Sequence, residues 1–144
     1  MLTALIAVLG TLAGSLLTGV IQHAARRSDI AAARHADGLA AVTELVAALA
    51  DHRRAMWVRE GLRLRGEDWT EARAESHRTR SAVTIPLLRV QLLMPSVAAL
   101  ARSAADATYA MRHPADEDVL AHQRDIAIHR TDVLVTAAGR HLAA

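Results

Sequence analysis

The chain begins with an apolar run that has the length of a membrane-spanning helix. Residues 2–21 are apolar apart from Thr, Ser and Gly, and residues 1–25 contain no Asp, Glu, Lys or Arg. At a rise of 1.5 Å per residue, a helix over this run spans about 30 Å, the thickness of the hydrocarbon layer of a bilayer. We therefore predict a transmembrane anchor over residues 1–25.

Beyond the anchor, apolar residues recur at the three- and four-residue spacing of an amphipathic helix. Neither Pro nor Gly interrupts residues 22–37, so the anchor helix is expected to continue, and Gly61 and Gly66 predict its end near residues 61–67. This helix carries an apolar interaction seam with one charged member, comprising Leu39, Val42, Val46, Leu49, Arg53, Met56 and Trp57.

Capping residues and a proline define a second predicted helix. Asp68 as N-cap with Glu71 three residues later resembles a capping box, and the helix that starts there is expected to run toward Leu93. Pro86 removes a backbone donor from this helix and restricts the residue before it. We therefore expect a kink or a break near residues 84–85.

Two more helices are bounded by prolines and by charge. Pro95 suits the first turn of a third helix, and Pro114 ends it. Asp116 and the two acidic residues after it then open a fourth helix, because acids are favourable at a helix N-terminus. Arg140 and His141 fall in its last turn, where cations are favourable.

These elements predict an all-α fold. No stretch alternates apolar and polar residues as a half-buried strand does, and the core-forming side chains are mostly the small Ala, Leu and Val, which need closely approaching helices. The predicted architecture is an N-terminal transmembrane helix (residues 1–25) that continues into an antiparallel helical bundle or hairpin of about four helices (residues 26–144).

The order of charges predicts how the anchor is oriented. Arg26 and Arg27 follow the apolar run, and no basic side chain precedes it. By the positive-inside rule the bundle lies in the cytoplasm and the N-terminus outside, as in a single-pass protein of the cell membrane. A cleaved signal peptide is the rival interpretation, but it would carry Lys or Arg before the apolar run.

Small residues form a strip along the predicted anchor. Their four-residue spacing stacks them on neighbouring ridges, where the backbone of another helix can approach closely. This strip predicts self-association, and the alternative is the general abundance of small residues in membrane helices. One ladder is Gly10, Gly14 and Thr18, and the other is Thr3, Ala7, Thr11, Ser15 and Gly19.

The cytoplasmic helices hold two clusters of polar residues. One follows the seam and comprises His52, Arg53, Arg54, Trp57, Arg59 and Glu60; Arg53 stands four residues before Trp57, which predicts a cation–π pair. Trp57 is expected to pack near the helix end, with a partner-binding role as the alternative. The other cluster lines one face of the last helix and is predicted to be a solvated face, with metal binding or pH sensing as the alternative: Asp118, His122, Asp125, His129 and Asp132.

Composition narrows the classes of function. The chain has no cysteine, and its 17 basic residues, all Arg, are interleaved with 15 acidic ones for a net charge of +2. With few aromatic side chains for base stacking, no nucleic-acid partner is expected. We find no P-loop, nucleotide-binding glycine motif or hydrolase motif, so we expect a non-enzymatic protein with no cofactor, metal or small-molecule substrate.

Three segments resemble a known family. They are LIAVLGTLAGSLLTG (residues 5–19), VAALADHRRAMWVRE (residues 46–60) and ARAESHRTRSAVTIPLLRV (residues 72–90). Together they are similar to a group of short actinobacterial proteins, common in Streptomyces, that carry the label kilB. The resemblance implies a membrane-associated role tied to plasmid transfer, to spread between hyphae and to a lethal function. It implies no catalytic residue.

Three hypotheses follow. The first is a self-associating membrane protein whose bundle docks a protein partner of unknown identity in plasmid spread. The second is a membrane-perturbing, holin-like toxin that uses the same anchor. The third is a secreted or soluble helical binding module that remains after the first ~25 residues are cleaved.

Overall fold

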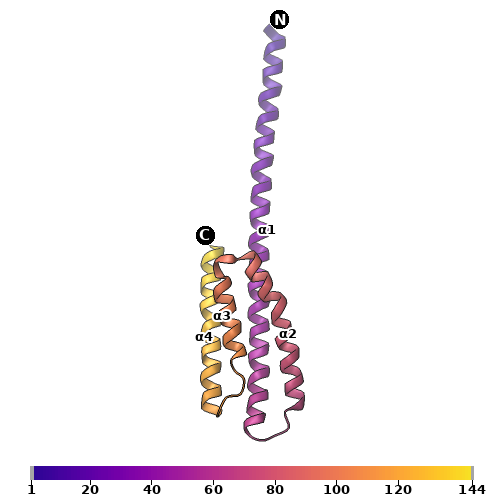
Figure 1. Cartoon of the computed structure of the whole chain (residues 1–144). Coiled ribbons are helices and arrows are strands. Elements are labelled where there is room, and N and C mark those ends of the chain that lie inside the picture. Colours follow the sequence, from indigo (N-terminus) through magenta and orange to yellow (C-terminus); the bar gives the residue numbers. More distant parts are fainter. Residues whose placement is uncertain (1, 144) are drawn as a thin grey trace. The chain divides into compact units, whose positions relative to one another are not determined.

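The computed structural model describes the backbone of residues 2–143 and the side chains of residues 26, 27 and 29–143. Over these residues the chain is helical, without strands, which confirms the all-α prediction (Figure 1). The elements are α1 (Leu2–Leu64), α2 (Thr70–Leu93), the short 3₁₀ helix η1 (Pro95–Val97), α3 (Ala98–Tyr109) and α4 (Glu117–Leu142). The chain divides into two compact units, Met1–Ala36 and Asp37–Ala144.

The first unit consists of the N-terminal part of α1. Arg26 and Arg27, the predicted topology determinants, are exposed. The predicted anchor, with its small-residue strip, lies outside the described side chains and stays a prediction. Among the described residues no single helix is long and apolar enough to span a bilayer, whereas Thr70–Leu93 and Pro95–Tyr109 together meet that test across a bend of 118°.

The second unit is an antiparallel bundle. Residues 37–64 of α1, then α2, α3 and α4, run alternately down and up beside one another in Figure 1. Its larger core cluster draws on all four helices and is rich in alanine, as in Ala41, Ala101, Ala104 and Ala105. Such small side chains fill a core only when the helix backbones approach closely, as the composition predicted.

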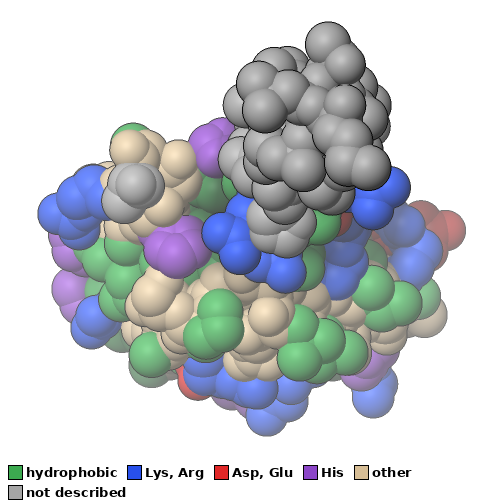
Figure 2. Space-filling view, turned by 90° about the horizontal axis from the view of Figure 1, so that it is seen from above, with side chains coloured by type: hydrophobic (Ala, Val, Ile, Leu, Met, Phe, Trp, Pro, Cys, Tyr) green, Lys and Arg blue, Asp and Glu red, His purple; other side chains and the backbone are tan. Residues whose placement is uncertain are grey.

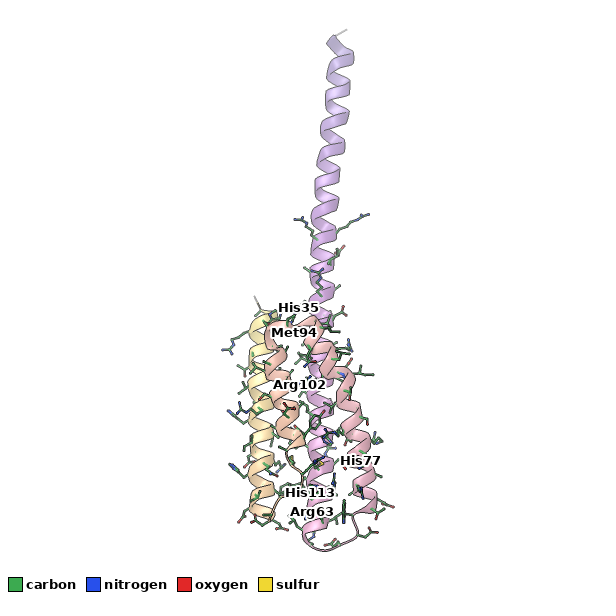
Figure 3. All side chains as sticks on the ribbon, viewed as in Figure 1. His35, Arg63, His77, Met94, Arg102 and His113 are labelled. Carbon is green, nitrogen blue, oxygen red and sulfur yellow. The ribbon has the colours of Figure 1, made fainter. Side chains whose placement is uncertain are left out.

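One end of the bundle is packed especially tightly around Gly38. A Cβ atom at this position would lie 3.3 Å from Leu142 Cδ2 and 3.4 Å from Met94 Sδ. The glycine therefore allows the start of the bundle part of α1 to lie against the ends of α2 and α4. Figure 3 places Met94 at this end and Arg63 at the opposite end.

The ends of the helices follow local chemistry. Gly66, two residues after the end of α1, adopts φ +70° as a left-handed turn residue. The second helix begins at Thr70 with Trp69 at the cap position, so the N-cap prediction at Asp68 is off by one residue. Asp68 still accepts hydrogen bonds from the Thr70 backbone N–H (3.0 Å) and hydroxyl (2.7 Å).

The remaining boundaries agree with the sequence in part. Asp116 caps α4 as predicted, because its carboxylate accepts a hydrogen bond from the Val119 N–H at 2.8 Å. Pro95 starts a 3₁₀ turn ahead of α3. We predicted a kink or a break before Pro86. The break is wrong, since α2 continues through Pro86 to Leu93. The buried side chains on either side of the proline hold the helix together despite one missing hydrogen bond.

Candidate functional site

The structure divides the seam predicted on α1 between the core and the surface. Val42, Leu49 and Met56 are buried and Val46 packs against the core. Leu39 is 52 % exposed, Trp57 is 38 % exposed and Arg53 is half-buried. The buried members serve the bundle of their own chain, and the role of this seam between copies stays a prediction.

The buried stripe of α1 differs from the predicted seam in alternate positions. Leu45 and His52 are buried next to Val46 and Arg53, which the seam contained. The two stripes share Val42, Leu49 and Met56, which are seven residues apart. Between these, the buried residue lies one position before the predicted one. Since Leu45 and Val46 are both apolar, spacing alone does not choose between them, and the facing helices decide.

His52 makes a polar contact inside the bundle. Its Nδ1 lies 3.0 Å from Thr79 Oγ1, and the Thr79 hydroxyl itself lies 3.0 Å from the Glu75 carbonyl, its natural acceptor. The threonine oxygen therefore accepts from His52 Nδ1–H, which leaves Nε2 as the unprotonated nitrogen. Among the described atoms, this buried Nε2 has no hydrogen-bond partner.

The surroundings of His52 favour the neutral ring. Burial, followed by the positive charges of Arg80, Arg59 and His77, lowers the pKa of His52 to about 4. The ring also meets Tyr109 edge-on, with 5.6 Å between centroids. The guanidinium of Arg80 lies over the Tyr109 ring, 3.9 Å from its centroid. This polar cluster therefore joins α1, α2 and α3.

A second polar cluster surrounds the carboxylate of Glu60, which is fully buried. Arg63 Nε donates to Glu60 Oε2 at 2.6 Å, and Arg63 Nη2 donates to the Pro114 carbonyl at 2.7 Å. Arg59 Nε lies 3.4 Å from Glu60 Oε1 and its guanidinium lies 5.4 Å from the Trp69 ring centroid. The cluster ties the end of α1 to the loop before α4 and to the start of α2.

Trp57 pairs with a different cation from the one predicted. Arg124 of α4 lies 5.0 Å from the Trp57 ring centroid. Arg53 points into the α1–α4 interface instead, where burial and the neighbouring Arg124 lower its pKa and Asp132 acts against them. The contact between helices replaces the one predicted within α1.

Two grooves flank the outer face of α1 near Trp57. Val58, 48 % exposed, borders both. The groove toward α2 has an apolar floor and walls formed by the ion pairs Arg54–Asp51 and Arg78–Glu75. The groove toward α4 includes Trp57 and Leu120. An apolar floor between charged walls suits a partner helix with an apolar stripe.

The polar face of α4 lies in solvent. Its five acidic and histidine residues are all exposed, as expected of a solvated face: Asp118, His122, Asp125, His129 and Asp132. Within the part of the chain that the structure describes, no group of three or more His, Asp or Glu side chains is placed to hold a metal ion.

The structure buries three of the six residues in the polar cluster predicted on α1, and these three hold helices together. His52, Arg59 and Glu60 face the core, whereas Arg54 and Trp57 face solvent. The sequence marked the cluster but not its inward face, because polar residues are usually placed outside.

Comparisons with known proteins agree on one family. The family described as "KilB plasmid transfer protein" matches residues 39–142. "Protein KilB" of Streptomyces lividans is 50 % identical over 147 residues, and the alignment covers 100 % of both chains. No solved structure matches the chain. The resemblance stated from residues 5–19, 46–60 and 72–90 is thereby confirmed, and the chain belongs to the KilB family of plasmid transfer proteins.

Proposed function

We propose that this chain is a non-enzymatic, single-pass membrane protein that self-associates and docks a protein partner during plasmid transfer and spread between hyphae. The observation that carries the proposal is the full-length similarity to KilB of Streptomyces lividans, together with the family match over the bundle. The family is named for plasmid transfer and not for a reaction.

The membrane part of the proposal is supported by the first 27 residues. An uncharged apolar run of bilayer length precedes the pair Arg26-Arg27, and both arginines are exposed. In this arrangement the bundle of residues 37–144 lies on the cytoplasmic side, where transfer components and plasmid are located.

The interaction part is supported by the surface of the bundle. The His52 and Glu60 clusters are enclosed and hold helices together, so they are not available to a partner. The two grooves beside Val58 are open and combine an apolar floor with charged rims. Their form fits the docking of a helix and not the enclosure of a small molecule.

Complementation tests the proposal. A transmissible plasmid that lacks its own KilB-family gene is expected to regain spread between mating mycelia when this chain is supplied. The chain should sediment with membranes and need detergent for release. Failure to restore spread, despite normal amounts of protein in the membrane fraction, would contradict the transfer role. Release into the soluble fraction without detergent would contradict the anchor.

A second candidate is the membrane-perturbing toxin. The observation that favours it is the uncharged apolar run of residues 2–21, the same predicted anchor on which the transfer role depends. Induced expression separates the two functions. Rapid loss of membrane potential, before growth stops, supports the toxin, whereas an intact potential with restored plasmid spread supports the transfer role.

A further inference from the structure

The C-terminal half of α2 is apolar on both of its faces. Val83, Leu87 and Val90 face inward and are buried. On the outer face Ile85 is 69 % exposed, Leu88 is 52 % exposed and Leu92 is 71 % exposed, and we call these three residues the α2 stripe. Leu93, 43 % exposed, lies beside it. This half of α2 therefore carries apolar side chains on a face that its own bundle leaves uncovered.

The spacing of the stripe matches a helical partner. With Ser81, which is also exposed, the positions follow one another at intervals of four, three and four residues. This is the a/d spacing of a coiled-coil seam, in which side chains of one helix enter holes on another. A helix that lies flat in a membrane surface carries a broader apolar face.

The charges around the stripe also favour a protein partner over a bilayer. Arg89 is the one charged residue between positions 81 and 93, and its guanidinium is hydrogen-bonded to the Glu44 carboxylate of α1. Surface-bound amphipathic helices rely on free Lys and Arg beside their apolar face to bind anionic lipid. Here the flanking cation is neutralised, which allows two identical surfaces to meet without repulsion.

The size of the stripe indicates how the partner is held. The stripe and Leu93 expose on the order of 400 Å², about half of the ~800 Å² that each partner contributes to a stable soluble interface. Two free bundles would therefore associate weakly. Two copies anchored in one membrane meet at a much higher effective concentration, and a small contact then suffices.

We infer that the α2 stripe is the surface through which the bundle contacts a second copy of this chain in the same membrane. A symmetric pair places the same patch of both copies in the contact, so Leu88, at the middle of the stripe, lies close to its counterpart. The inference rests on the proposed function, because it needs copies that share a bilayer.

Thiol crosslinking tests this contact directly, because the chain contains no cysteine. The full-length chain carrying Leu88→Cys is treated in native membranes with a short bismaleimide. The matched control is Val135→Cys, an apolar position on α4 that is 45 % exposed. We expect about fivefold more crosslinked dimer from Leu88→Cys than from the control, since only the former position lies within a tethered contact. Adding Ile85→Glu should lower the yield to that of the control without changing the thermal melt.

Two results would overturn the inference. Equal crosslinking of Leu88→Cys and Val135→Cys would show that the stripe does not meet a second copy. Protection of Leu88→Cys from a water-soluble maleimide by the membrane, without crosslinking, would assign the stripe to the bilayer. A parallel Ser15→Cys variant in the predicted anchor separates this failure from that of the proposed function: dimers through Ser15→Cys alone leave self-association standing, and dimers at neither position contradict both.

Discussion

The two halves of the bundle differ in what they bury and in what they expose. Toward Met94 the interior holds apolar side chains such as Leu45, Val90 and Leu134, and the surface carries the apolar α2 stripe. Toward Arg63, which Figure 3 labels at the opposite end, the interior encloses His52 and Glu60 beside a second apolar cluster that includes Met56 and Met111. Figure 2, which views the bundle from the Met94 side, shows hydrophobic side chains exposed among the arginines.

The difference separates two tasks. Small apolar side chains pack in many related ways, so the apolar half supplies buried area but little specificity. A buried carboxylate or imidazole needs partners of matching geometry, so the His52 and Glu60 clusters favour one alignment of the helices that they join. The exposed α2 stripe thus lies in the apolar half of the bundle, whose helices are also aligned by the His52 and Glu60 clusters in the polar half.

Breaking the Glu60 cluster should have the largest effect on stability. Glu60→Gln keeps the volume but removes the charge that faces Arg59 and Arg63. Leaving buried cations uncompensated costs about 3–5 kcal/mol, which should lower the Tm of the detergent-purified chain by roughly 10 °C or more. The matched control is Glu75→Gln, which breaks an exposed pair with Arg78 and should leave the Tm nearly unchanged. Equal losses in the two variants would contradict a special role for the polar half.

A cavity in the apolar half should be nearly as costly. Leu45 is fully buried, and Leu45→Ala should destabilise the bundle by about 2–4 kcal/mol through lost burial and incomplete collapse. Leu39→Ala, at an exposed position of the predicted seam, should change stability by less than about 1 kcal/mol. Thermal denaturation followed by circular dichroism measures both variants. A larger loss of stability with Leu39→Ala than with Leu45→Ala would mean that the predicted seam, and not the observed stripe, faces the core.

The pH dependence of the polar half follows from His52. Its folded pKa of about 4 lies below the 6.5 of an exposed histidine, so the unfolded chain takes up a proton first as the pH falls. Above about pH 6.5 the ring is neutral in both states, so His52 does not change the free energy of unfolding with pH. As the pH falls from 6.5 toward 4, the unfolded chain binds the proton and up to about 3 kcal/mol of stability is lost. His52→Gln should flatten that part of the Tm-against-pH curve. Parallel curves for variant and wild type would show that carboxylates, and not His52, carry the acid sensitivity.

The smallest effect is expected on the outer face of α2. Leu92→Gln replaces a side chain that is 71 % exposed and should change stability by about 0.5 kcal/mol or less. Leu87→Gln, on the buried face of the same helix, places an unpaired amide in the core and should be clearly destabilising. A large loss of Tm with Leu92→Gln in dilute detergent would mean that the stripe belongs to the fold of one chain.

Local signals were enough to predict most helix ends. Gly66, Pro95 and Asp116 act through their own backbone or side chain, so their effects are visible without the rest of the fold. Local signals did not predict that α2 continues through Pro86, because side chains packed from other helices offset the missing hydrogen bond.

The interior of the polar half was the part least accessible to sequence reasoning. Burial of Glu60 depends on Arg63 reaching both the carboxylate and the Pro114 carbonyl, 51 residues further along the chain. The pairing of Trp57 with Arg124 likewise joins residues from different helices. Exposure of the α2 stripe could be recognised only once the inward face of α2 was known.

Plasmid spread with a stripe variant tests most directly whether the chain acts in transfer by pairing with a second copy through the α2 stripe. A plasmid that lacks its own KilB-family gene is complemented with wild type, Leu88→Glu or the surface control Val135→Glu, at matched amounts in the membrane fraction. We expect wild type and the control to restore spread between mycelia, while Leu88→Glu leaves it at the level of the empty vector with an unchanged melting curve. Full spread with Leu88→Glu would contradict a role for the α2 stripe in transfer.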